Sequence, residues 1–322
     1  MMKIKVAIIG GAGYTGGELL RLLVNHPEVE LVYVHSNSQK GKAVSSLHPD
    51  LLGDTDLVFT DEVDTNGIDA VFLGLPHGET KSFLDKHSFA EETVIIDLST
   101  DFRDESEGFV YGLPETKKHK ISQAKKIANP GCFATAIQLA LLPAVKSGWA
   151  TSPIHVSGIT GSTGAGKKLA ETSHFSYRNN NFSVYKLFTH QHLKEINMTF
   201  SQVNNDFSSD ILFVPYRGNF ARGIWITAYL PCDKSIEEIT ETYKSFYKDS
   251  PFTIVSDQDI DLKHVVNTNK CVLHLKKEKG QLVIYSAIDN LLKGASGQAV
   301  HNFNLAFGLP ETTGLKLKSI AF

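Results

Sequence analysis

A cysteine stands at the start of an apolar helix pattern, directly behind a Pro-Gly pair. In "NPGCFATAIQLALLPAV", no charge occurs between Cys132 and Lys146, and Pro130 and Gly131 interrupt whatever precedes them. A thiol at the first turn of a helix meets unpaired backbone N–H groups and the positive end of the helix dipole, which stabilise a thiolate. A free cysteine is also a common small buried hydrophobe. The position therefore allows two interpretations of Cys132, a nucleophile or a structural residue.

Two histidines and a glutamate occur together in "THQHLKEI". His190 lies near the expected start of a helix, and a frayed first turn would let the Glu195 carboxylate reach back and orient a histidine as a proton carrier. His190 and His192 are two residues apart, whereas helical metal sites prefer a spacing of four, so we expect no metal. Because the chain has 13 histidines, a structural or solvated pair is the alternative.

A glycine cluster lies between a strand pattern and a helix pattern near the N-terminus. "GGAGYTGGEL" spaces Gly10, Gly13 and Gly16 by three residues, after "KIKVAII" and before "LLRLLVNH". Such glycines let the backbone turn tightly and approach a pyrophosphate at the helix N-terminus. We expect these glycines, Tyr14 and Thr15 to contact a dinucleotide, with Thr15 available as the helix cap. The alternative is a tight turn without a ligand.

The end of the second strand pattern indicates which dinucleotide is bound. An acid there usually binds the ribose 2′-OH of NAD, but "ELVYVHS" continues into "NSQKGK". Hydroxyls and cations suit a 2′-phosphate, so Ser36, Ser38 and Lys40 favour NADP(H) as the cofactor. The alternative is a solvated basic loop.

A second glycine cluster nearly matches a nucleotide phosphate loop. "GSTGAGKK" has the glycines and a lysine, but Lys168 occupies the position where Ser or Thr must bind magnesium. A kinase-type site is therefore disfavoured. We expect either a loop that brings backbone amides and Lys167 to an anionic group, or a flexible surface loop.

The order of strands and helices predicts an α/β protein with two domains. Strand patterns alternate with helical ones up to Cys132, which predicts a Rossmann-type parallel sheet. Longer strand patterns follow, such as "GIWITAYL" and "QLVIYSAI", and predict an α+β domain with a mixed or antiparallel sheet. We expect residues 1–131 with about 291–322 to form the NADP-binding domain, and residues 132–290 to form the catalytic and oligomerisation domain.

Composition excludes several classes of protein. The 322 residues carry a net charge of −3, so neither nucleic acid nor an anionic membrane is an expected partner. Three scattered cysteines exclude a disulfide framework and fit a reducing, cytoplasmic setting. Glycines interrupt the first apolar run too early for a signal peptide, and no run has the length of a membrane helix.

Six segments, two of them already described, occur in a specific order along the whole chain. They are "DLSTDFR" (97–103), "YGLPE" (111–115), "NPGCFAT" (129–135), "THQHLKEI" (189–196), "DNLLKGASGQA" (289–299) and "GLPETTGL" (308–315). With the first glycine cluster, they resemble the N-acetyl-gamma-glutamyl-phosphate reductase family, relatives of aspartate-semialdehyde dehydrogenase. Each segment alone is weak, and their order makes the likeness specific.

The resemblance implies an NADPH-dependent reduction of a small-molecule acyl phosphate in arginine biosynthesis, by a homodimer or homotetramer. Cys132 matches the family's nucleophile, which would form a thioester, and His190 matches its acid/base. Arg103 resembles the residue that holds the substrate phosphate, and Asn129 and His192 are expected beside the substrate. The segment around Asn290 is expected near the nicotinamide.

The chain departs from the family pattern in three places. Phe133-Ala134 replaces a usual Tyr-Pro, Gln191 replaces an Arg between the histidines, and "SGITGSTGAGK" is longer than the usual turn. These changes leave the acyl group open: N-acetyl is expected, and N-succinyl-glutamyl, carrier-bound aminoadipyl or aspartyl phosphate are alternatives. A dinucleotide-sensing protein without catalysis is the alternative from another class.

Overall fold

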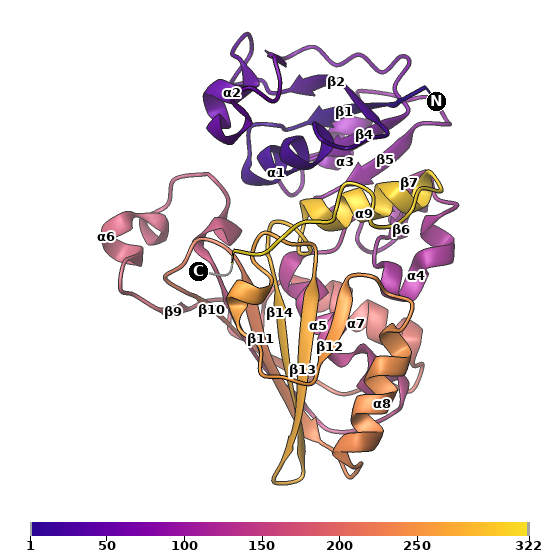
Figure 1. Ribbon diagram of the computed structural model, residues 1–322, viewed down its shortest axis with the longest axis vertical. Helices are drawn as coiled ribbons and strands as arrows, with labels where there is room; N and C mark the ends of the chain where they lie inside the picture. The colour runs from indigo at the N-terminus through magenta and orange to yellow at the C-terminus, as the bar shows by residue number, and fades with distance from the viewer. Residues whose placement is uncertain (1, 321–322) are drawn as a thin grey trace. The chain divides into compact units, whose positions relative to one another are not determined.

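The computed structural model describes residues 2–320 and divides into two units, residues 2–130 with 295–316 and residues 131–294 with 317–320 (Figure 1). Each unit contains one seven-stranded sheet. All strands of the first sheet run parallel, whereas the second sheet mixes parallel and antiparallel neighbours. The predicted fold class is therefore confirmed. The roles expected for the two domains stay predictions.

The first unit alternates strands with helices. In chain order its elements are β1 (Ile4–Ile9), α1 (Tyr14–Leu23), β2 (Val29–His35), α2 (Val44–Leu47), η1 (Pro49–Leu51), β3 (Phe59–Thr60), β4 (Ala70–Leu73), α3 (Thr80–Leu84), β5 (Val94–Asp97), η2 (Ser106–Gly108), β6 (Val110–Tyr111), α4 (Pro114–Ile121), β7 (Lys126–Ala128) and α9 (Ser296–Ala306). The late helix α9 packs against α1, α4 and β5.

The strand order of the first sheet is β3-β2-β1-β4-β5-β7-β6. The chain adds β2 and β3 on one side of β1 and the later strands on the other side, so the strand order switches beside β1. The last four residues of β1 and all of β4 and β5 are buried, as expected for strands covered on both faces. Ligands of such sheets bind outside the carboxyl ends of the strands at this switch point. The ends of β1, β2 and β4 are therefore the expected cofactor site.

The second unit combines strands of up to eight residues with the longer helices α5, α7 and α8 and the short helix α6. In chain order its elements are α5 (Cys132–Lys146), β8 (Ile154–Thr160), η3 (Ser162–Ala165), η4 (Glu171–Ser173), α6 (Phe175–Arg178), β9 (Ser183–Val184), α7 (His192–Val203), β10 (Ile211–Arg217), β11 (Ile224–Pro231), α8 (Ile236–Tyr247), β12 (Thr253–Ser256), η5 (Leu262–His264), β13 (Cys271–Glu278) and β14 (Gln281–Ile288). The strand order is β12-β13-β14-β11-β8-β10-β9.

Helix α5 is buried except at its two end residues and packs against β11, β14 and α7. Pro143 lies inside this helix and has no N–H, so the Leu139 carbonyl lacks its usual helical donor. The Tyr247 hydroxyl of α8 donates to the Leu139 carbonyl at 2.6 Å. This bond satisfies the buried carbonyl and ties α8 to the helix that begins at Cys132.

Candidate active site

The first glycine cluster forms an open turn in front of α1. Gly10 has a φ of +82°, and an added Cβ would lie 2.5 Å from the Gly74 carbonyl oxygen, so glycine is required there. A Cβ added at Gly16 would lie 2.6 Å from the backbone of Gly11. Gly13 is the N-cap of α1, and an added Cβ there would meet nothing within 4 Å. The free space, the helix N-terminus and a first turn without acidic residues fit a pyrophosphate.

The predicted capping role of Thr15 is wrong. Helix α1 begins one residue earlier, at Tyr14, and its N-cap is Gly13, with no side-chain capping bond. The Thr15 carbonyl instead accepts a hydrogen bond of 2.8 Å from the Ser296 hydroxyl. The Tyr14 ring is 40% exposed at the same end of the helix.

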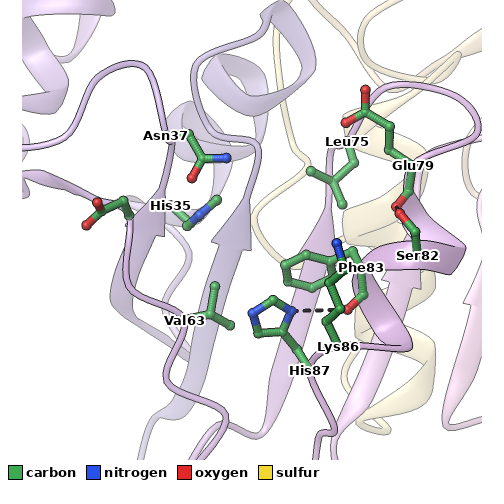
Figure 2. A pocket seen from close by; sticks show the side chains of 10 residues that line it. His35, Asn37, Val63, Leu75, Glu79, Ser82, Phe83, Lys86 and His87 are labelled. Carbon is green, nitrogen blue, oxygen red and sulfur yellow. Dashed lines mark hydrogen bonds between the residues drawn. The ribbon is translucent and has the colours of Figure 1, made fainter.

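A pocket of about 390 Å³ opens where β2 ends (Figure 2). Figure 2 shows Asn37 and Val63 on one side and Leu75 and Ser82 on the other. The lining residues are His35, Asn37, Asp61, Val63, Leu75, Glu79, Ser82, Phe83, Lys86 and His87. They lie at or just after the ends of β2, β3 and β4, or on and next to α3. A Rossmann sheet binds the adenosine half of a dinucleotide at this edge.

The residues expected to bind the 2′-phosphate lie beside this pocket. Ser36 is buried, and its N–H donates to the Thr60 carbonyl at 2.8 Å. Lys40 is exposed, and its Nζ lies 2.9 Å from the Asp61 carboxylate, which raises the pKa of the lysine through a hydrogen bond. Ser38 accepts a hydrogen bond from Gln39 at 3.3 Å. Sequence reasoning missed Asp61 because this acid follows β3, not β2.

Two expected substrate-binding residues of the first unit are already engaged. The Arg103 guanidinium is buried and donates to the carbonyls of Asn129 and Leu98, at 2.9 and 3.1 Å. The Asn129 amide donates to the Ala295 carbonyl at 3.0 Å, and its oxygen accepts from Asn302 at 3.1 Å. These bonds hold the segment that leads into Cys132.

Cys132 is the first residue of α5, directly after the N-cap Gly131. It is partly exposed, whereas Cys232 and Cys271 are buried, and none of the three is in a disulfide. Gly294 packs so closely that an added Cβ would lie 2.9 Å from the Cys132 Cβ. The structure thus places the thiol at the positive end of a buried helix, where a thiolate is stabilised.

Glu195 links the start of α5 to the histidine pair. One of its carboxylate oxygens accepts the Gly131 N–H at 3.0 Å, and the other lies 3.9 Å from the His192 Nε2. Helix α7 begins at His192, so His190 lies just before the helix. The carboxylate therefore reaches His192 and the turn that carries Cys132, whereas the sequence favoured His190 as its partner.

His190 is buried, and its ring makes edge contacts with His192 and Phe133 at centroid distances of 4.6 and 5.5 Å. Burial, followed by the charges of Lys186 and Arg217, lowers the pKa of His190 to about 4. At neutral pH this imidazole is uncharged and can accept a proton. The helix terminus is therefore the stabilising feature beside the Cys132 thiol.

Sequence reasoning missed three neighbours of His190. The Tyr185 ring meets the His190 ring at a centroid distance of 5.8 Å, and the Arg217 guanidinium lies over the Tyr185 ring at 4.9 Å. Lys186 donates to the Gln191 side-chain oxygen at 2.6 Å. Gln191 thus holds a cation close to the position where the resembled family carries an arginine. No spacing rule brings these residues together, because they come from a loop and the end of β10.

The second glycine cluster forms a single turn, η3, after β8 and is not followed by a long helix. Lys167 is exposed just beyond this turn. The Asn290 side chain accepts the Gly223 N–H at 2.7 Å and donates to the Thr163 hydroxyl at 3.0 Å. Asn290 thereby ties the turn to the start of β11.

A buried ion pair that sequence reasoning missed supports the same region. Arg222 donates from Nε and Nη2 to the two oxygens of Asp289, at 3.0 and 3.1 Å. Asp289 is fully buried and also accepts the N–H of Leu291 at 2.8 Å. The pair fixes the loop that presents Gly294 to Cys132.

Residues 2–320 contain no cluster of three or more His, Cys, Asp or Glu side chains arranged to hold a metal ion. Among the helices of the same residues, none has the length and apolar character needed to cross a membrane.

Comparison with known proteins identifies the family. "Semialdehyde dehydrogenase, NAD binding domain" matches residues 5–124, and "Semialdehyde dehydrogenase, dimerisation domain" matches residues 132–290. The aspartate semialdehyde dehydrogenase II of Vibrio cholerae, complexed with ASA, is similar with a TM-score of 0.76 at 16% identity, covering 96% of this chain and 99% of that one. An aspartate semialdehyde dehydrogenase with NADP from Candida albicans has a TM-score of 0.68 at 14% identity, covering 94% and 98%. These structures share the fold.

Relatives of much higher identity carry a single name. The N-acetyl-gamma-glutamyl-phosphate reductase of Parabacteroides distasonis is 55% identical over 321 residues, which is 99% of this chain and all of the relative. The reductase of the same name from Christiangramia forsetii is 54% identical over 318 residues, 98% of this chain and 99% of the relative. The predicted resemblance is confirmed: the chain is an oxidoreductase of the semialdehyde dehydrogenase family, and within that family it belongs to the N-acetyl-gamma-glutamyl-phosphate reductases.

Proposed function

We propose that this chain reduces N-acetyl-gamma-glutamyl phosphate to the corresponding semialdehyde and phosphate, with NADPH as the reductant, in arginine biosynthesis. The observation that carries the proposal is the position of Cys132 at the N-terminus of α5, in the same unit as the buried, neutral His190. The names of the full-length relatives support the substrate.

In the first step, the neutral His190 accepts the proton of the Cys132 thiol. The thiolate attacks the acyl carbon, a C–S bond forms, and the C–O bond to phosphate breaks with its electron pair leaving on phosphate. The backbone N–H groups of the first turn of α5 stabilise the negative charge that develops on the acyl oxygen. Glu195 orients Gly131 at this turn through its 3.0 Å hydrogen bond.

In the second step, the thioester on Cys132 is reduced. NADPH, when bound, supplies the hydride that adds to the thioester carbon. His190, now protonated, donates its proton to the developing oxygen and forms a thiohemiacetal. At collapse the oxygen returns that proton to His190, the C–S bond breaks, and the Cys132 thiolate is regenerated with the aldehyde.

The remaining predicted residues have proposed binding roles. Arg103, Asn129, Lys167 and His192 contact the substrate, Arg103 through its phosphate. Asn290 lies near the nicotinamide. The turn around Gly10, Gly13, Tyr14, Thr15 and Gly16 binds the pyrophosphate of NADP(H), and Ser36, Ser38 and Lys40 bind its 2′-phosphate.

The two units have separate proposed roles. The first binds NADP(H), and the second carries the chemistry. The match of residues 132–290 to a dimerisation domain supports self-association, and we propose a homodimer or a homotetramer built through this unit. The three cysteines outside disulfides fit the reducing cytoplasm as the compartment.

The acyl group is tested by comparing substrates. We expect the N-acetyl compound to have a higher kcat/KM than the N-succinyl compound, which is bulkier and carries an additional charge. Gln191 and the lengthened turn after β8 change the surroundings of the acyl group, so the comparison is informative. Steady-state constants for both acyl phosphates provide the measurement, and a strong preference for N-succinyl would contradict the N-acetyl assignment.

The 2′-phosphate is expected to make NADPH the preferred cofactor over NADH. Replacing Lys40 with alanine should weaken NADPH binding about three- to tenfold, because an exposed cation contributes modestly, and should leave NADH binding unchanged. Equilibrium titration of both cofactors by fluorescence measures this without turnover. Equal or better binding of NADH by the unaltered chain would refute the preference.

A further inference from the structure

Two cations lie close to His190 on different elements. Lys186 precedes α7 and is held by Gln191, and Arg217 ends β10. Both charges lower the pKa of His190, after the larger effect of burial. Two cations close together in a partly buried site favour the binding of an anion. The second unit thus has a positively charged site next to its proton carrier.

Arg217 and Cys132 both act on Tyr185. The Arg217 guanidinium is 4.9 Å from the centre of the Tyr185 ring. The pKa of Tyr185 is raised to about 12, first by burial and then by the charge of Cys132, while the charge of Arg217 and a hydrogen bond with it act in the opposite direction. Tyr185 therefore interacts with both the guanidinium and the reacting cysteine.

The guanidinium of Arg217 has an unused donor. Its Nε is buried and has no hydrogen-bond partner among residues 2–320. Other arginines of the unit are fully occupied by contrast. Arg222 forms a bidentate pair with Asp289. Arg178 donates to the backbone carbonyls of Thr172 and Arg217. A buried guanidinium N–H without an acceptor is costly, so Arg217 has the features of a ligand-binding residue.

We propose that Arg217 binds a carboxylate of the substrate and holds the acyl chain in place during both chemical steps. A guanidinium fork matches a carboxylate through two parallel hydrogen bonds. A carboxylate, unlike the phosphate, stays on the molecule until the aldehyde leaves, so its binding orients the thioester throughout. The inference rests on the proposed function and adds a residue that determines which acids bind.

The reverse reaction separates a carboxylate from a phosphate, because the aldehyde and inorganic phosphate enter as two substrates. We expect Arg217→Met to raise the KM of the aldehyde about 10- to 100-fold, the span of a lost charge-assisted hydrogen bond. The KM of phosphate should stay within about twofold. Lys244→Met, which removes an exposed cation of α8 paired with Asp257, is the matched control and should change neither constant.

Two aldehydes distinguish the possible sources of the carboxylate. An equal rise in KM for the N-acetyl and N-succinyl aldehydes assigns Arg217 to the α-carboxylate, and a rise for the N-succinyl aldehyde alone assigns it to the acyl carboxylate. A rise in the KM of phosphate alone, or no change in either constant, overturns the proposal.

Alkylation of Cys132 tests Arg217 independently of turnover. Iodoacetate carries a carboxylate and iodoacetamide does not, so a nearby guanidinium accelerates only the first reagent. We expect Arg217→Met to lower the ratio of the two rates about tenfold while the iodoacetamide rate stays unchanged, which also shows that the site is folded. Arg217→Lys should keep most of the ratio. An unchanged ratio in Arg217→Met overturns the proposal, even if the chain were to reduce another acyl phosphate.

Discussion

Cys132→Ala is expected to abolish reduction of the acyl phosphate while leaving NADPH binding nearly intact. The sulfur forms the covalent bond that makes the acyl carbon reducible, and no neighbouring side chain replaces it. The cofactor turn belongs to the other unit, so its binding should not depend on the thiol. Mass spectrometry after mixing with acyl phosphate, without NADPH, should show one acyl adduct in the unaltered chain and none in the variant.

The other two cysteines provide the controls for this experiment. Cys232 and Cys271 are buried, so iodoacetamide should label Cys132 first, with loss of activity in proportion to that label. Cys232→Ala and Cys271→Ala should keep their turnover and their acyl adduct. An acyl adduct on Cys132→Ala, or full turnover by that variant, would rule out the covalent mechanism.

His190→Asn should become acylated only slowly, through the thiolate that forms without a base, and should reduce the thioester about 10²- to 10⁴-fold more slowly, the usual contribution of a general acid. Asparagine retains polarity but cannot move a proton between Cys132 and the developing oxygen. Single-turnover measurements separate the two steps, with the adduct followed by mass and reduction followed by NADPH absorbance. His192→Asn is the matched control and should lose less activity.

The pH dependence follows from the lowered pKa of His190, about 4 in the free protein. The imidazole is in its base form above that value, so the acid limb of kcat/KM that it causes should lie near pH 4 and not near 6.5. If His192→Asn were the crippled variant, the role assigned to His190 would be wrong. If an acid limb near pH 6.5 disappeared in His190→Asn, His190 would be the base but its pKa would not be lowered.

Patterns local in sequence predicted the fold well. Buried runs such as "VAII" favour strands covered on both faces, and their alternation with helices predicted the parallel first sheet. The apolar run after Cys132 forms a helix, because its Pro-Gly boundary and its composition act within one segment. Thr15 was misjudged because helix termini shift by a residue without any change in the pattern.

The sequence by itself determined the division into two units, one with a parallel sheet and one with a mixed sheet. It also placed the thiol at the start of a helix and indicated the family through the order of the motifs. Only the tertiary structure decided that His190 is neutral, that Glu195 holds Gly131, and that Arg217 lies over Tyr185. Each of these depends on burial or on contact between segments far apart in the chain. Desolvation and through-space charge have no signature in residue spacing, so the protonation state of the site emerges only once the chain is folded.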